Sequence, residues 1–225
     1  MSMIFGVNSV DPANIKLTNG YDLFTWVMRK SSPPSFWGRN ISGNNRLTRD
    51  EVNFLHGKYC NVALIFDELT EAKVSIAFGY ADGMRAVTAA KGLGVPDDRR
   101  IALFVEIKDD WSVNHNWMLG YAHTLLSNGY LPGFIGNTDS SKNFNFGRQC
   151  SHYVQFMHAV AREYTVYWAT EPKEEGEPSE WSPYCPSELT PEKIDLWHNG
   201  DMIKYGDMNI KQNYARDESI IRFMW

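Results

Sequence analysis

The chain has 225 residues, of which 43% are hydrophobic and 22% are charged, with a formal net charge of −5 and a pI of about 5.7. This composition predicts one folded domain with a sizeable core and argues against disorder. Lysines and arginines are scattered singly, so the basic surface that nucleic-acid binding requires is not expected. No apolar stretch approaches the length of a membrane span, so no membrane partner is expected either.

The first residues, MSMIFGVNSVDP, lack a basic segment followed by a long apolar stretch, so no signal peptide is expected. The three cysteines, Cys60, Cys150 and Cys185, are odd in number and widely spaced, which predicts neither a disulfide framework nor a zinc site. We expect synthesis in the cytoplasm, with action outside the cell only if another route releases the protein. The sequence does not indicate an oligomeric state.

Short apolar runs alternate with amphipathic stretches along the whole chain. Strands are predicted at IFGVNSV (4–10), SFWGRNIS (35–42), NVALIFDEL (61–69), RRIALFVEI (99–107), YLPGFIGNT (130–138) and YTVYWAT (164–170), with shorter candidates at IDLWHNG (194–200) and GDMNIKQNYA (206–215). Helices are predicted within 20–30, 47–60, 70–96, 114–129 and 146–163. Thr48, followed three residues later by Glu51, has the pattern of a capping box.

Alternation of strands and helices about eight times predicts an α/β fold, a single (β/α)8 TIM-type barrel over residues 1–225 that is irregular in its last units. The acidic, proline-bearing stretch at about 171–193 is predicted to be a loop or insert. A doubly wound open sheet is the alternative. The Gly-x-Gly-x-x-Gly fingerprint and the P-loop are both absent, so no nucleotide cofactor is expected, and no other cofactor is indicated.

Acidic residues follow several of the predicted strands, and in a barrel these strand ends build the active site. Glu106, Asp67 and Asp207 are therefore predicted to share a partly dry hollow and to act as catalytic groups. The register of the third strand is not fixed by the sequence, so Glu68 is an equal alternative to Asp67. Glu106 follows the apolar run IALFV, so desolvation should raise its pKa and suit it to general-acid catalysis. The alternatives are an ion pair of Glu106 with Arg39 or a lysine, and a turn-capping role for Asp207.

Aromatic residues are plentiful, with 8 Trp, 11 Tyr and 12 Phe, which favours a carbohydrate ligand modestly. Trp168 and Trp197 are predicted to stack on sugar rings at the rim. The remaining predicted substrate contacts are Asn8, Arg39, Glu68 and Asn209. The six histidines show no ligand-type spacing and no Gly-x-Ser-x-Gly elbow is present, so neither a metal site nor a serine nucleophile is expected.

Several segments stand in a familiar order: FGVNSV, FWGRNIS, LTRDEVNFLHGKYCNVALIFDE, GYADGMRAVTAAKGLGVPDDRRIALFVEI, YWAT, IDLWHN and GDMNI. Over roughly residues 4–215 the chain resembles glycoside-hydrolase-like TIM-barrel domains of unknown function. These domains are related to family-25 glycoside hydrolases, lysozyme-type muramidases that cleave peptidoglycan. The resemblance places Glu106 at the general-acid position, Asp207 at a cleft-lining aspartate and Asp67 at or beside an acidic strand end. Asn8 and Phe104 stand where relatives carry aspartates.

The resemblance implies a glycoside hydrolase acting on cell-wall or another amino-sugar glycan. Glu106 would be the acid, while Asp67 and Asp207 would stabilise charge or position water or an acetamido group. A catalytically decayed barrel that binds carbohydrate is the main alternative, favoured by Asn8 and Phe104. A different barrel enzyme, such as a phosphate-binding aldolase or isomerase, is the third reading, although WHNGDMIKYGD is a poor phosphate loop.

Overall fold

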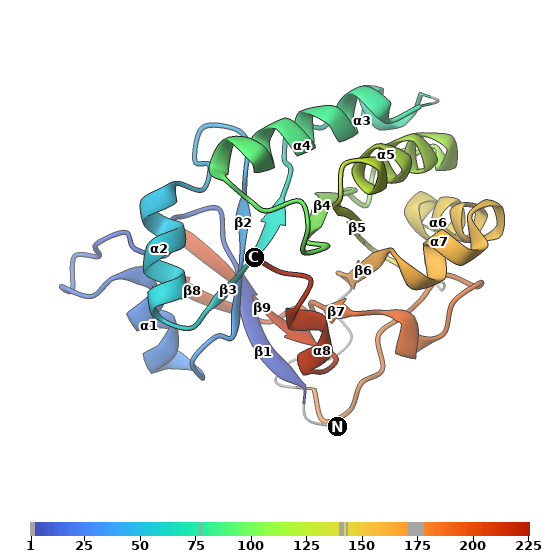
Figure 1. Cartoon of the computed structure of the whole chain (residues 1–225). Coiled ribbons are helices and arrows are strands. Elements are labelled where there is room, and N and C mark those ends of the chain that lie inside the picture. Colours follow the sequence, from blue (N-terminus) through green and yellow to red (C-terminus); the bar gives the residue numbers. More distant parts are fainter. Residues whose placement is uncertain (1–2, 77, 140–141, 143, 171–177) are drawn as a thin grey trace.

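The computed structural model describes residues 3–76, 78–139, 142, 144–170 and 178–225. Figure 1 shows a ring of strands with helices around much of its outside. The strands are β1 (Ile4–Asn8), β2 (Phe36–Asn40), β3 (Asn61–Ile65), β4 (Ala102–Glu106), β5 (Leu131–Gly136), β6 (Val166–Ala169), β7 (Leu196–Trp197), β8 (Met202–Tyr205) and β9 (Met208–Ala215). The helices are α1 (Leu23–Lys30), α2 (Arg49–Gly57), α3 (Glu71–Val74), α4 (Tyr80–Leu93), α5 (His115–Ser127), α6 (Asn145–Phe156), α7 (His158–Glu163) and α8 (Glu218–Ile221), with a short 3-10 helix at Pro191–Lys193.

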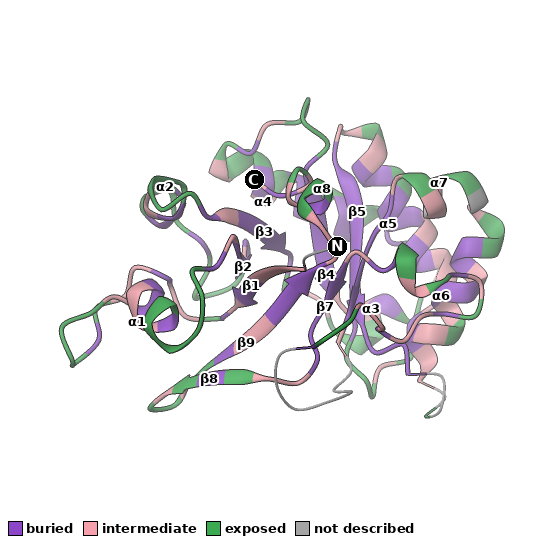
Figure 2. Cartoon of the chain, turned by 90° about the horizontal axis from the view of Figure 1, so that it is seen from below, coloured by how far each residue is buried: buried purple, intermediate pink, exposed green. Residues whose placement is uncertain are grey.

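Eight strands close into a barrel, so the predicted barrel is confirmed and the open sheet is excluded. The strands β1 to β7 follow in parallel order, and β9 pairs with both β7 and β1 to complete the ring. The predicted irregularity of the last units is confirmed, because β9 runs antiparallel to both neighbours. The β8 strand lies outside the ring as the hairpin partner of β9, and Figure 2 shows this hairpin projecting from the barrel.

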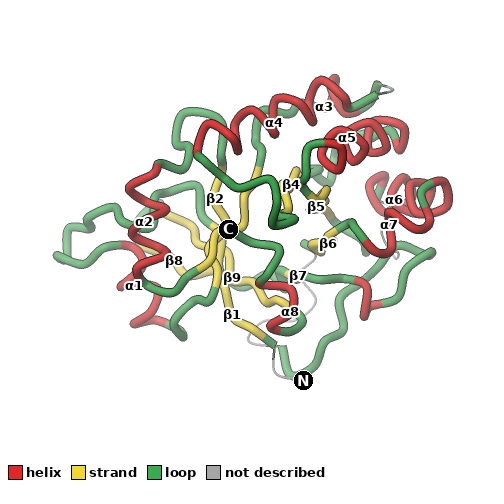
Figure 3. The backbone as a smooth tube through the Cα atoms, viewed as in Figure 1, coloured by secondary structure: helices red, strands yellow, loops and turns green. Residues whose placement is uncertain are grey.

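Alternating side chains fill the barrel interior, as the period of two along a strand requires. Phe36, Ile65, Phe104, Leu131 and Trp168 are among the buried residues of this inner cluster. A second, larger cluster packs between the strands and the surrounding helices. Figure 3 shows the strands inside and the helices outside, with the stretch from residue 178 to β7 drawn mainly as loop.

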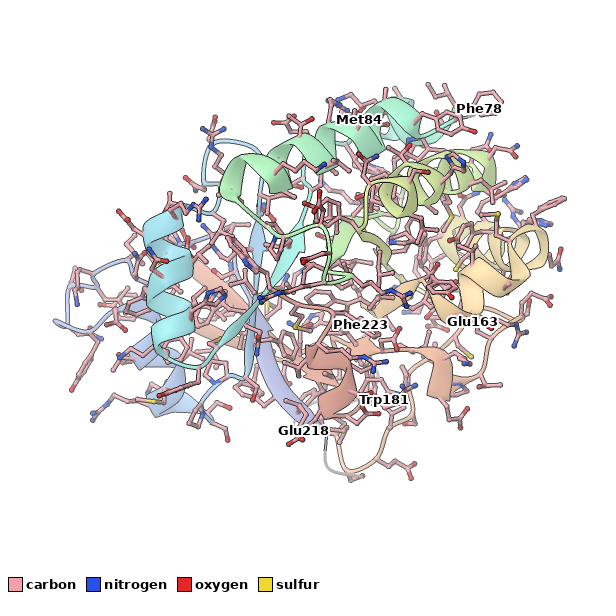
Figure 4. All side chains as sticks on the ribbon, in the orientation of Figure 1. Phe78, Met84, Glu163, Trp181, Glu218 and Phe223 are labelled. Carbon is pink, nitrogen blue, oxygen red and sulfur yellow. The ribbon has the colours of Figure 1, made fainter. Side chains whose placement is uncertain are left out.

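The C-terminal segment closes the end of the barrel at which the parallel strands begin. Backbone hydrogen bonds join Trp225 to Val62 next to the start of β3, and the Ala102 amide of β4 donates to the Phe223 carbonyl. Figure 4 shows Phe223 close to α8 at this end. Ile220 and Met224 complete the floor of the inner cluster. The opposite mouth, where β1 to β7 end, is therefore the open end of the barrel.

The predicted cap of α2 is confirmed, since the Thr48 hydroxyl accepts a hydrogen bond from the Glu51 amide. Of the predicted loop at 171–193, residues 171–177 lie outside the described part of the chain. Residues 178–193 are irregular apart from the 3-10 turn. No helix in the described residues is long and apolar enough to cross a bilayer.

Candidate active site

A pocket of about 240 Å³ opens at the mouth of the barrel. Its wall is built from the ends of β1 to β4 and from the first half of β9, which reaches the mouth because that strand is antiparallel. The lining residues are Asn8, Ser9, Val10, Asn40, Ile65, Asp67, Glu106, Lys108, Asn209 and Lys211. Four of the nine residues predicted for catalysis or substrate binding line it: Asn8, Asp67, Glu106 and Asn209.

Asp67 and Glu106 come from neighbouring strands. In the parallel pairing of β3 with β4, Ile65 lies opposite Phe104. Extending this pairing by two residues places Asp67, just beyond the end of β3, beside Glu106 at the end of β4. Both residues continue the inward-facing sets that begin with Ala63 and Ala102. The strand register therefore brings two carboxyl groups into one pocket above an apolar layer, as the sequence predicted for Glu106.

The two carboxyl groups differ in their surroundings. Asp67 is exposed at the rim, but partial desolvation of its carboxyl group raises its pKa. The nearby negative charge of Glu106 raises this pKa further, while Lys108 opposes the rise. Asn40 donates a hydrogen bond from Nδ2 to Asp67 Oδ2 at 2.9 Å. Glu106 Oε1 instead lies 3.3 Å from the ammonium group of Lys211, and both side chains are partly exposed. Of the two alternatives for Glu106, the lysine ion pair is the one found.

A buried hydrogen-bond chain lies beneath the pocket. The Trp168 indole, 2% exposed, donates to Asn213 Oδ1 at 3.0 Å, and Asn213 Nδ2 donates to Asn8 Oδ1 at 2.8 Å. A Cβ atom added at Gly38 would meet the Asn8 Cβ at 2.6 Å and the Trp168 ring at 3.2 Å, so the floor is closely packed. Trp168 thus supports the pocket from inside the barrel, and the prediction that it stacks on sugar at the rim is wrong.

Arg39 was predicted to contact substrate, and this prediction is also wrong. Its guanidinium group is fully buried and pairs with Glu51, with Nε 2.7 Å from Oε1. The remaining N–H groups donate to the carbonyls of Ser9, Val10 and Asn45. A guanidinium group carries five N–H donors, which allows Arg39 to bind Glu51 and the three carbonyls together. The hydrogen bonds to Ser9 and Val10 hold the loop after β1 in place. Arg39 shapes the pocket wall without facing the pocket.

Three further predicted contacts lie elsewhere. Trp197 is 2% exposed and packs on the outside of the barrel against Trp181, with ring centroids 5.8 Å apart, so it cannot form a sugar platform. Glu68 lines a separate groove beside α4, where it lies 3.8 Å from Arg85. Asp207 is exposed in the two-residue turn of the β8–β9 hairpin, after Gly206 with its φ of 56°. The prediction that Asp207 shares the hollow with Glu106 is therefore wrong.

Three residues at or beneath the pocket were not predicted from the sequence: the lysines Lys108 and Lys211 and the buried Asn213. A signal was present in β9, where Asn209, Lys211 and Asn213 recur with the period of two that marks one strand face. Among the residues that the structure describes, no group of three or more His, Cys, Asp or Glu side chains could hold a metal ion. The pocket offers proton donors, carboxylates and ammonium groups, which suit acid–base chemistry on a polar ligand.

Comparisons with known proteins extend this picture at the level of the fold. No protein-family model and no curated protein matches the chain. An uncharacterized protein of B. stearothermophilus is 24% identical, over 99% of this chain and 100% of that one, with a TM-score of 0.80. A bacterial lysozyme from Streptomyces coelicolor is 9% identical, over 99% of this chain and 97% of that one, with a TM-score of 0.58. The chain has the fold of a bacterial lysozyme.

A third solved structure also shares the lysozyme-like barrel. It is a Tat-secreted protein of Mycobacterium tuberculosis in complex with L-tartrate, 12% identical, over 97% of this chain and 98% of that one, with a TM-score of 0.61. Identities this low establish a common fold, and one fold serves many activities. The activity of this chain therefore depends on the residues at the barrel mouth.

Proposed function

We propose that this chain is a glycoside hydrolase that cleaves a cell-wall or other amino-sugar glycan in the pocket at the barrel mouth. The observation that carries the proposal is the convergence of Asp67 and Glu106 in one pocket, within a lysozyme-like barrel. Glycosidic cleavage uses such a pair: one carboxylic acid protonates the leaving oxygen and the second carboxylate stabilises or attacks the cationic sugar. The close spacing of adjacent strands favours the nearer pair of a retaining mechanism.

The surroundings of the two groups suggest their roles. Asp67, whose pKa is raised by desolvation and by the Glu106 charge, would act as the general acid. Glu106, with the Lys211 ammonium at 3.3 Å, would act as the charged carboxylate. This assignment reverses the roles expected from the sequence, where Glu106 was the acid. Asn40, which donates to Asp67, would orient that carboxyl group.

The ligand of a structural neighbour supports a polar, hydroxylated substrate. The M. tuberculosis protein is described in complex with L-tartrate, a small acid with two hydroxyl and two carboxylate groups. In the present chain, carboxamide, carboxylate and ammonium side chains together line a pocket whose volume of about 240 Å³ suits one sugar ring. Neighbouring rings of a polymer would extend over the rim.

Release of reducing ends from peptidoglycan and from chitin tests the proposal directly. We expect release by the wild-type protein and its loss, by at least about 100-fold, in Asp67→Asn and in Glu106→Gln. Asp207→Asn is the matched control, because it removes an exposed carboxylate outside the pocket, and it should retain wild-type activity. Absence of product from these glycans and from other amino-sugar polymers would contradict the proposal.

A carbohydrate-binding barrel without catalysis is the second candidate. It is favoured by Asn8 and Phe104, which stand where the hydrolases that the sequence resembles carry aspartates, and by the lysine that pairs with Glu106. Under this alternative, chitotetraose would bind with an affinity measurable by calorimetry and remain uncleaved. Binding in wild type that survives in Asp67→Asn, with no product from either protein, would identify this function.

A further inference from the structure

The amide of Asn213 has a fixed orientation under the pocket. Its Oδ1 faces the indole N–H of Trp168 at 3.0 Å, and an indole nitrogen can only donate. Its Nδ2 lies 2.9 Å from the backbone carbonyl of Lys211, which can only accept. Both neighbours require the same placement of the amide oxygen and nitrogen. Asn213 is fully buried, so water cannot relax this constraint.

The orientation of Asn8 follows from that of Asn213. Because Asn213 presents its N–H group, the atom of Asn8 that faces it at 2.8 Å must be the carbonyl oxygen. The amino group of Asn8 is then on the other side of its amide. Asn8 lines the pocket, so the pocket gains a donor whose polarity is set by a buried chain of three residues. An aspartate at this position would offer only acceptors.

Positive charge lies beside this donor. Asn8 and Lys211 are direct partners in the antiparallel pairing of β1 with β9, so their side chains leave the sheet on the same face, with Cβ atoms about 5 Å apart. Lys211 reaches Glu106, and Lys108 enters the same pocket from the residues after β4. In the proposed function Asp67 carries the proton of the general acid, so the two ammonium groups outweigh the single charge of Glu106 and the pocket does not repel an anionic ligand.

We infer that Asn8 and Lys211 form a subsite for the carboxylate of an acidic sugar. The inference rests on the proposed function, since it names the substrate class of the same pocket. A carboxylate only accepts hydrogen bonds, and here it meets one amide donor and one ammonium group. Hydrogen bonds to charged groups are stronger than neutral ones, so the subsite selects acidic over neutral sugars. The carboxylate can be carried at C6, as in a uronic acid, or on a lactyl ether at C3, as in muramic acid.

Binding of matched monosaccharides, followed by NMR titration of the amide signals, tests this subsite without requiring hydrolysis. One pair is methyl β-D-glucuronide and methyl β-D-glucoside, and the other is N-acetylmuramic acid and N-acetylglucosamine. We expect the acidic member of at least one pair to bind about tenfold more tightly or better, the effect of one hydrogen bond to a charged group. The pair that shows the difference identifies the carboxylate source. Equal affinities within both pairs would overturn the inference.

Two variants separate the subsite from a general effect of charge. Lys211→Met should abolish the preference for the acidic sugar, whereas Lys58→Met, at the exposed end of α2 and outside the pocket, should preserve it. Asn8→Asp keeps an oxygen for Asn213 but replaces the pocket-facing donor with a negative oxygen, and it should also remove the preference. Retention of the preference in both Lys211→Met and Asn8→Asp would refute the assignment. These binding measurements do not involve hydrolysis. A negative result would therefore overturn the carboxylate subsite and leave the proposed hydrolase function to be decided by the release of reducing ends.

Discussion

Replacement of Glu51 by Gln tests whether Arg39 is a structural residue. Arg39 is fully buried and Glu51 is 1% exposed, and the carboxylate accepts from Arg39 Nε at 2.7 Å, from Arg39 Nη2 at 3.2 Å and from the Ala13 amide at 2.8 Å. In the Glu51→Gln variant, the guanidinium group would keep its positive charge inside the protein without a counter-charge. One amide N–H of the glutamine would also face N–H donors of the arginine.

The expected loss of stability is large. Removing one partner of a buried ion pair costs about 3–5 kcal/mol, a substantial part of the roughly 5–15 kcal/mol that stabilises a typical domain. For a chain of this size, each 1 kcal/mol lowers the melting temperature by about 2–4 °C, so a decrease of about 6–20 °C is expected. Arg39 also holds the carbonyls of Ser9 and Val10, two residues of the pocket wall, so ligand affinity should fall as well.

Urea unfolding followed by circular dichroism measures the change, with calorimetric melting as a second assay. Asp50→Asn is the matched control, because Asp50 is an exposed acid in the first turn of the same helix and its loss should cost no more than about 1 kcal/mol. A Glu51→Gln protein within about 1 kcal/mol of wild type would refute the reasoning. It would show that the Arg39 charge is solvated or paired in another way.

Three further changes test the pocket floor and the barrel. Gly38→Ala should destabilise the protein and weaken glycan binding, since the added methyl group would lie 2.6 Å from the Asn8 Cβ; thermal melting and calorimetry would detect both effects. Trp168→Phe should cost about 1–3 kcal/mol more in urea unfolding than Trp37→Phe, because only the first indole has a hydrogen-bond partner among the described residues. Burial raises the pKa of Asp195 from 3.8 to about 7, so between these pH values the folded chain keeps a proton that the unfolded chain loses. As pH rises from 4 to 7, the free energy of unfolding of the wild-type protein should therefore fall relative to that of Asp195→Asn. An equal difference in unfolding free energy at pH 4.5 and pH 7.5 would contradict this assignment.

The parallel part of the barrel was predictable because its strands have strong local signals. The β4 strand is a buried apolar run, and counting by two from Ala102 places Glu106 on the inner face at the mouth. The same count on β3 leads through Ala63 and Ile65 to Asp67. Glu106 was therefore placed at the mouth from sequence, whereas the choice between Asp67 and Glu68 required the register of β3 that the structure supplies.

The remaining site residues could not be placed from local signals. Trp168 is on the inner face of β6, but it lies one layer below the rim, and the depth of a residue depends on the stagger between strands. The burial of Arg39 depends on Glu51, which approaches it from another element. The direction of β9 is set by the hairpin with β8, so Asn209 reaches the mouth at the start of its strand and not at its end. These relations are tertiary, and no pattern within one segment contains them.

Asn8 distinguishes two functions of the barrel mouth: recognition of acidic sugars by an active hydrolase, and the decay of a former hydrolase. In a decaying hydrolase, the change from a charged to a neutral side chain would be a simple loss, and Asn8→Asp should leave acidic sugars unaffected or restore cleavage. In the structure, however, Asn8 is fixed by Asn213 and stands directly across from Lys211, whose charge an aspartate would neutralise. With the neutral amide, Lys211 is shared between Glu106, at 3.3 Å, and a ligand carboxylate, whereas an aspartate at position 8 would add another negative charge beside it. Loss of acidic-sugar binding in Asn8→Asp, with an unchanged melting temperature, would identify the substitution as a change in recognition, whereas a gain in cleavage would identify it as decay.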